Sequence, residues 1–244
     1  PLHQQLQLLQ PLIDDPITAV RMDVAIALAG VPLDQISADQ AVALRTLFTE
    51  YLAVYTQHSD MPGTQLQLGI FHTQRGDLPA AEAAYREAIA LNVQLVPGYL
   101  NLADLLRSQQ RDEEARSLLL QALEIAPNHG DTLHALGLLE TRHQQSELAL
   151  DYFKRAAEME QQGTRHRFVY AIALHDLGQP QAAITQLKSL LRQVPQSEEV
   201  ILALANYSAE LGQVPAARGY ARQLLKIAPI NRSYQQLNKQ LSGQ

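Results

Sequence analysis

The stretch that decides the fold is residues 68–88, which read LGIFHTQRGDLPAAEAAYREA. A small residue, Gly69, follows the bulky Leu68, and the dipeptide Gly76-Asp77 then signals a turn. After the turn, apolar residues recur at spacings of four and three, which places their side chains on one face of an α-helix. The stretch therefore predicts a pair of helices, in which the glycine lets the second helix approach the first closely.

The same pattern returns every 34 residues, in five successive copies and without a change of period. The small residue of each copy stands at Gly69, Ala103, Gly137, Ala171 and Ala205. The alanine twelve positions later stands at Ala81, Ala115, Ala149, Ala183 and Ala217. A single helical pair cannot bury its apolar stripe alone, so this regularity predicts that neighbouring copies stack on one another.

The repeated positions resemble the tetratricopeptide repeat (TPR) family. The resemblance rests on Leu68-Gly69, Gly76-Asp77, Ala81, Tyr85, Ala88 and the matching positions of the four later copies. It implies an all-α fold, a right-handed superhelical solenoid of five TPR helix pairs. The pairs are expected at about residues 62–95, 96–129, 130–163, 164–197 and 198–231, with a capping helix and tail at 232–244. Gln110 and Gln144 depart from the family, because they replace the usual turn glycine.

Residues 1–60 follow a different pattern. Leucines within residues 2–12 predict a short helix. An acid-proline turn at Asp15-Pro16, then Val20-Arg21 and a helical run from Met22 to Ala29, resembles one HEAT-type repeat. A further helix, from about Ala38 to Gln57, is expected to connect this HEAT-like segment to the first TPR helix.

Composition excludes several kinds of chemistry. The net charge of −6 argues against a nucleic-acid partner, which usually requires a basic face. The chain has no cysteine, which rules out disulfides, thiolate metal sites and covalent haem attachment within it. No stretch approaches the roughly 18 apolar residues that can span a bilayer, so no membrane span is expected.

HEAT-like units that lead directly into TPRs resemble the C-terminal part of bacterial multihaem cytochrome-c-like proteins. The segments of residues 101–107 and 134–138 are similar in sequence to segments of proteins in that group. The resemblance implies a periplasmic parent protein whose haem sites lie upstream, and the start at Pro1 without a Met indicates a piece of a longer or processed chain. The alternative identity is a stand-alone bacterial TPR adaptor in the cytoplasm.

No catalytic constellation is found, and no cofactor or metal is expected in this chain. The eight histidines, which include His3, His134 and His166, are interpreted as solvated. The acids of residues 112–114 stand where a second helix begins, so they are interpreted as complementing the helix dipole.

The candidate binding residues lie on the first helix of each pair, which lines a concave groove in stacked TPRs. They are Asn101, Asp104, Arg107, His134, Leu138, Arg142, Arg165, Phe168, Ile172, His175 and Asn206. Asn101 and the arginines are expected to hold a peptide backbone or carboxylate, and Phe168 with Ile172 to face an apolar ligand. Leu66, Leu100 and Leu202 are expected to form the apolar floor of this groove. The competing interpretation is that these leucines only pack between neighbouring repeats.

Three functions follow from these observations. The first is a scaffold that binds a protein or peptide in the groove, not an enzyme. The second is a docking or accessory arm of a larger multihaem cytochrome-like redox protein. The third is a self-association module that forms a homodimer through its end helices.

Overall fold

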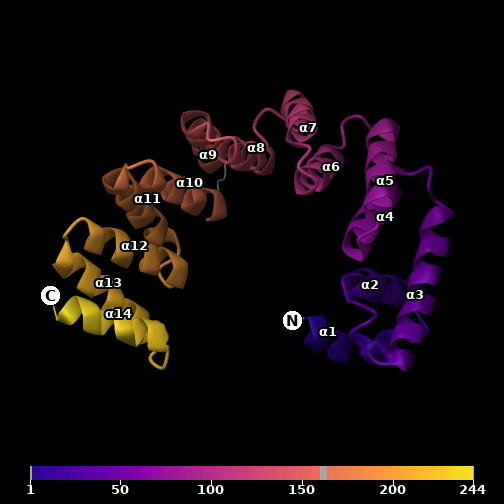
Figure 1. The fold of residues 1–244 in the computed structure, drawn as a ribbon, viewed down its shortest axis with the longest axis horizontal. Coiled ribbons are helices and arrows are strands. Elements are labelled where there is room, and N and C mark those ends of the chain that lie inside the picture. The colour runs from indigo at the N-terminus through magenta and orange to yellow at the C-terminus, as the bar shows by residue number, and fades with distance from the viewer. Residues whose placement is uncertain (1, 160–163, 244) are drawn as a thin grey trace. The chain divides into compact units, whose positions relative to one another are not determined.

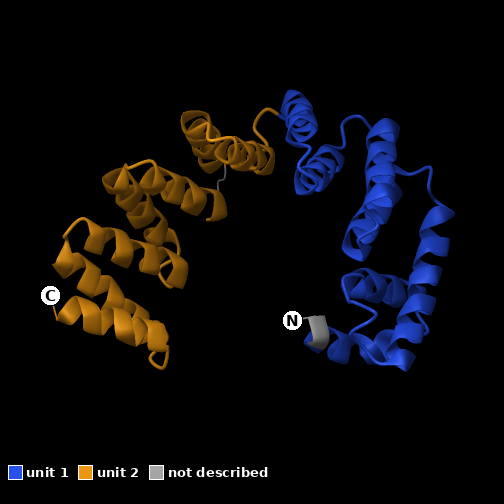
Figure 2. Cartoon of the chain, in the orientation of Figure 1, with its two compact units in different colours: residues 1–126 blue, residues 127–244 orange. Residues whose placement is uncertain are grey.

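The computed structural model describes residues 2–159 and 164–243, and these residues contain helices and no strand. The chain divides into two compact units, residues 1–126 and residues 127–244 (Figure 2). The helices of the first unit are α1 (Leu2–Leu9), the short 3-10 helix η1 (Gln10–Leu12), α2 (Thr18–Leu28), α3 (Ala38–Thr56), α4 (Pro62–Arg75), α5 (Leu78–Leu91), α6 (Val96–Ser108) and α7 (Asp112–Ile125). Those of the second unit are α8 (Gly130–Arg142), α9 (Ser146–Met159), α10 (Arg165–Asp176), α11 (Pro180–Gln193), α12 (Glu198–Glu210), α13 (Val214–Ile227) and α14 (Arg232–Ser242).

The predicted helix pairs are confirmed. In each predicted repeat, two consecutive helices pack on each other, from α4 with α5 to α12 with α13 (Figure 1). Residues 160–163, the end of the third predicted repeat, lie outside the described residues. None of the helices in the described part of the chain is both long and apolar enough to cross a membrane.

Glycine at the small-residue position is required by an aromatic ring on the second helix. A Cβ atom on Gly69 would lie 2.3 Å from the ring of Tyr85, and one on Gly137 would lie 2.5 Å from the ring of Phe153. Even one additional carbon would overlap these rings, so the glycines set the close approach of α4 to α5 and of α8 to α9.

The turns inside the pairs share one backbone conformation. Gly76, Gly178 and Gly212 adopt the left-handed region, with φ between 69° and 77°. Gln110 and Gln144 stand at the same position and adopt it too, with φ of 62° and 59°. The turn geometry is therefore kept where the glycine is lost, at the cost of backbone strain.

The N-terminal segment shares a core with the first repeat. Leu28, Leu44, Tyr51 and Phe71 are buried in one apolar cluster that joins α2 and α3 to α4. Tyr51 stacks on Phe71 with ring centroids 4.6 Å apart. α3 therefore packs on α4, whereas the HEAT-like character of residues 1–60 remains a prediction.

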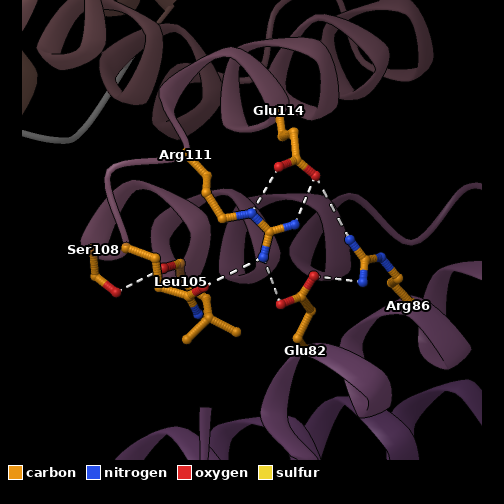
Figure 3. A network of polar contacts seen from close by, with 7 residues as sticks. Glu82, Arg86, Leu105, Ser108, Arg111 and Glu114 are labelled. Carbon is orange, nitrogen blue, oxygen red and sulfur yellow. Dashed lines mark hydrogen bonds and ion pairs between the residues drawn. The ribbon is translucent and has the colours of Figure 1, made fainter. Parts of the chain in front are cut away.

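An ion-pair network joins α5 to α7 in the first unit (Figure 3). Arg111, which precedes α7, donates to Glu82 at 2.8 Å and to both carboxylate oxygens of Glu114 at 2.7 Å. Arg86 contacts Glu82 at 2.5 Å on the same side of α5. Glu114 lies in the first turn of α7, as the interpretation of the acid cluster expects. The hydrogen bond from Arg111 is the main reason that the pKa of Glu82 lies below its ordinary value.

At the C-terminus, α14 covers the last pair. Leu241 of α14 is buried with Ala217 and Ala221 of α13, and Leu237 packs beside them. Asn231 caps α14 by accepting hydrogen bonds from the backbone N–H groups of the next turn. The predicted capping helix is confirmed.

Candidate functional site

The candidate residues lie on the first helices of the pairs, and two open cavities adjoin these helices. One cavity lies wholly within the first unit, between α4, α5 and α6. The other lies wholly within the second unit, between α8, α9 and α10. Each is therefore formed by both helices of one repeat and the first helix of the next repeat.

The cavity of the first unit has a volume of about 620 Å³ and a mixed lining. Its wall residues are Ile70, Thr73, Gln74, Leu78, Tyr85, Asn101, Asp104, Leu105 and Ser108. The hydroxyl of Thr73 donates to the carbonyl of Gly69 at 2.8 Å and lies 3.1 Å from the hydroxyl of Tyr85. Asp104 is largely exposed and accepts a hydrogen bond from Arg107 at 2.9 Å. Asn101 and Asp104 thus add an amide and a carboxylate to this wall.

The cavity of the second unit has a volume of about 260 Å³ and is mainly apolar. Its wall residues are Leu138, Thr141, Ser146, Ala149, Leu150, Phe153, Val169, Ile172, Ala173, Asp176 and Leu177. The hydroxyl of Thr141 donates to the carbonyl of Gly137 at 2.8 Å, so it already has an acceptor. Asp176 is the one charged residue among these wall residues.

The two cavities occupy equivalent places in the repeat. The shared wall positions are separated by two 34-residue periods, that is, by 68 residues. They are Ile70 and Leu138, Thr73 and Thr141, Leu78 and Ser146, Tyr85 and Phe153, Asn101 and Val169, Asp104 and Ile172, Leu105 and Ala173, and Ser108 and Asp176. The same scaffold position therefore carries a mixed wall in one unit and a mainly apolar wall in the other.

A hydrogen-bonded histidine lies beside the second cavity, between α10 and α12. The ring of His175 stacks on Tyr207 with centroids 3.6 Å apart and planes inclined by 4°. Its Nε2 lies 2.6 Å from Glu210, and its Nδ1 lies 3.4 Å from Asp176. Partial burial lowers the pKa of His175, but the bonds to the two carboxylates together raise it by more, so the net shift is upward.

Four of the predicted groove residues line the cavities: Asn101 and Asp104 in the first unit, and Leu138 and Ile172 in the second. Phe168 and Ile172 are half-buried and pack on the apolar core of α10, α11 and α12. Arg142, Arg165 and Asn206 are exposed on α8, α10 and α12. The contribution of these side chains to binding remains a prediction.

Two of the histidines do not fit the interpretation that all eight are solvated. His134 and His166 are each only 6% exposed, and their rings lie 5.2 Å apart. Gly130 leaves space for the ring of His166, and Asp131 lies 3.2 Å from its Nε2. The expectation of solvated rings is wrong for this pair because α10 covers α8 there. The side chain of His3 lies outside the described residues.

The sequence did not predict the wall residues that lie on second helices, or the wall residue that lies next to a predicted position. Tyr85 and Phe153, on the second helices α5 and α9, also line the cavities and are not among the predicted groove residues. Val169 is not among the predicted groove residues, although it directly follows Phe168, which is one of them. The 34-residue register could have found it, since Val169 stands two periods after Asn101.

Family models described as "Tetratricopeptide repeat" match most of the chain. The matched segments are residues 63–96, 95–162, 134–198 and 173–232. They overlap or adjoin without a gap, so the matches run from residue 63 to residue 232. The resemblance to HEAT repeats and to multihaem cytochromes, and the compartment, remain predictions.

Solved structures with the same fold are numerous, at low sequence identity. YrrB, described as "a TPR protein with an unusual peptide-binding site", is 20% identical, with a TM-score of 0.58 over 77% of this chain and 96% of that one. Pseudomonas aeruginosa pilF is 19% identical, with a TM-score of 0.60 over 91% of this chain and 99% of that one. Yeast Tom70 is 15% identical, with a TM-score of 0.63 over 99% of this chain and 57% of that one. At these identities the likeness establishes the fold alone.

A curated relative is anaphase-promoting complex subunit 3 of Schizosaccharomyces pombe. It is 25% identical over 122 residues, which are 49% of this chain and 18% of that protein. The match therefore spans less than a fifth of the relative.

Proposed function

Because this chain belongs to the tetratricopeptide repeat family over residues 63–232, we propose that it is a scaffold that binds a peptide segment of a partner protein along its first helices. The observation that carries the proposal is the pair of cavities at equivalent positions on those helices. Four residues selected from the sequence alone line these cavities. The peptide-binding site attributed to YrrB, a protein of the same fold, is consistent with such a role.

Each unit provides a different kind of contact. In the second unit, Leu138 and Ile172 offer apolar surface, and burying one large apolar side chain there stabilises a complex by about 1.5–3 kcal/mol. In the first unit, Asn101 offers an amide that can pair with a peptide backbone. The proposal assigns binding, and not catalysis, to these residues.

Site-specific photo-crosslinking tests this assignment. A photoreactive benzoylphenylalanine replaces either Ile172 or Asp104 in the full chain, which is produced in cells of its source organism and irradiated. A matched control carries the same group at Lys188, which is exposed on the second helix α11. We expect cross-linked partners from positions 172 and 104 and none, or far fewer, from position 188. Equal yields from all three positions, or partners at Lys188 alone, contradict the proposal.

A further inference from the structure

The two equivalent cavities are lined by different side chains, and this difference indicates which peptide side chain the second cavity accepts. We propose that the cavity between α8, α9 and α10 accepts a large apolar side chain of a bound peptide, next to a Lys or Arg of the same peptide. Val169 and Ile172 set this preference. Asn101 and Asp104, at the same positions in the first unit, exclude it there. This inference rests on the proposed peptide-binding function and adds the class of side chain.

The lining of the second cavity disfavours a polar side chain. Phe153 stands where the first cavity has the hydroxyl of Tyr85, and Val169 and Ile172 stand where it has an amide and a carboxylate. The hydroxyl of Thr141 is occupied by the carbonyl of Gly137. Apart from Ser146 and the carboxylate of Asp176 at the rim, a polar group that enters this cavity finds few partners to replace water, whereas an apolar group needs none.

The size of the cavity suits one side chain. Its volume is about 260 Å³, compared with about 620 Å³ in the first unit. An enclosed apolar cavity of about 150 Å³ suffices for benzene. The second cavity, which is open to solvent, therefore has room for a branched aliphatic or aromatic side chain, but not for a longer segment.

The charge at the rim selects the neighbouring residue of the peptide. Asp176 lines the cavity with its side chain 70% exposed, and Glu210 lies on the far side of His175. Even with His175 protonated, these three groups carry a net negative charge. A basic residue beside the apolar one would therefore meet Asp176 directly.

The first unit serves as an internal reference. Its cavity has the same position, the same threonine hydrogen bond and a similar aromatic wall, but Asn101 and Asp104 are among its wall residues. Exchanging these two residues in each unit therefore swaps an amide and a carboxylate for two apolar side chains and leaves the other wall positions as they are.

Selection of a phage-displayed library of random dodecapeptides on the full chain tests the inference. Three proteins are compared: the wild type, the double variant Val169→Asn/Ile172→Asp, and the reciprocal double variant Asn101→Val/Asp104→Ile. Enriched peptides are synthesised, and their affinities are measured by fluorescence anisotropy. Circular dichroism melting of each protein shows that the variants are folded at the assay temperature.

We expect the wild type to enrich peptides with a large apolar residue next to Lys or Arg. The Val169→Asn/Ile172→Asp variant is expected to bind them at least tenfold more weakly. The reciprocal variant, whose second cavity is unchanged, is expected to enrich the same class of peptides. Enriched peptides that bind equally well to the wild type and the Val169→Asn/Ile172→Asp variant overturn the inference, while the proposed function stands. Enrichment of acidic or wholly polar peptides also overturns it. If no protein enriches any peptide, the proposed function fails and the inference fails with it.

Discussion

Glycine and aromatic residues occur together in the repeats. Gly69 and Gly137 are followed sixteen residues later by Tyr85 and Phe153, whereas the repeats with alanine at the small position have Leu119, Leu187 or Ala221 there. The two side chains share one volume between the helices, so a larger residue on one side requires a smaller one on the other.

Substituting Gly137 with Ala tests this shared volume. Because the added Cβ would lie 2.5 Å from the Phe153 ring, we expect the variant to lose about 1–3 kcal/mol of stability in urea unfolding. Adding Phe153→Leu reproduces the pairing of the second and fourth repeats and is expected to restore at least half of the loss. If the double variant loses as much as the sum of the single variants, the two positions do not share a volume.

The turn residue Gln144 is strained, because its φ of 59° lies in the left-handed region. Gln144→Gly is expected to stabilise the protein by about 0.5–1 kcal/mol, because glycine adopts this conformation without a Cβ clash. The gain is only partial because glycine loses more chain entropy on folding. Gly178→Gln, at the same position of the next repeat, is the control and is expected to destabilise by a similar amount. Thermal melting of both variants checks the prediction, and an unchanged or lowered melting temperature for Gln144→Gly contradicts it.

Among the elements, α5 and α7 are joined by the charges around Glu82. Its pKa lies below 4.5 in the folded protein, so the network adds stability at pH values above that, and the contribution is lost as the pH falls through the folded pKa. Glu82→Gln is therefore expected to cost about 1–2 kcal/mol at pH 7 and nearly nothing once the carboxylate of the wild type is protonated. Urea unfolding at a series of pH values between 7 and 3 measures the difference.

Glu87→Gln, at an exposed position of the same helix, is the control for the loss of one negative charge. It is expected to change stability by less than about 0.5 kcal/mol throughout the series. A difference between Glu82→Gln and the wild type that does not shrink with falling pH means that another interaction of Glu82 is responsible.

The elements show why the fold could be predicted and the site only in part. The helix pairs follow from local rules that recur at each period, such as the small residue at Gly137 and the turn at Gly178. The start of α2 at Thr18, four residues before the predicted run, depends instead on hydrogen bonds: Asp15 accepts from the N–H of Ile17, and its carbonyl accepts from Arg21. The cavities combine residues of three helices, so positions taken from first helices alone include Ile172 but not Phe153, which lies on the second helix α9.

For the whole molecule, each unit has its own buried clusters. In repeat proteins, each helix pair contacts only its neighbours, so the effect of a local change decays along the chain. We expect Gly137→Ala to reduce hydrogen-exchange protection of backbone amides in α8 and α9, and to leave amides near Tyr51 and Phe71 unchanged. The reciprocal change, Gly69→Ala, should affect α4 and α5 and spare α12 and α13. Loss of protection across both units in either variant would mean that they unfold together.

The division of each cavity between two repeats has a consequence for making chimaeras. Grafting one repeat, such as residues 130–163, would carry α8 and α9 but leave behind the wall that α10 supplies. A transplant that carries all the wall residues of this cavity together with the whole of α8 runs from residue 130 to residue 177, about one and a half repeats, and ends at the Gly178 turn. In this molecule the portable module therefore begins at a repeat boundary and ends inside the next repeat.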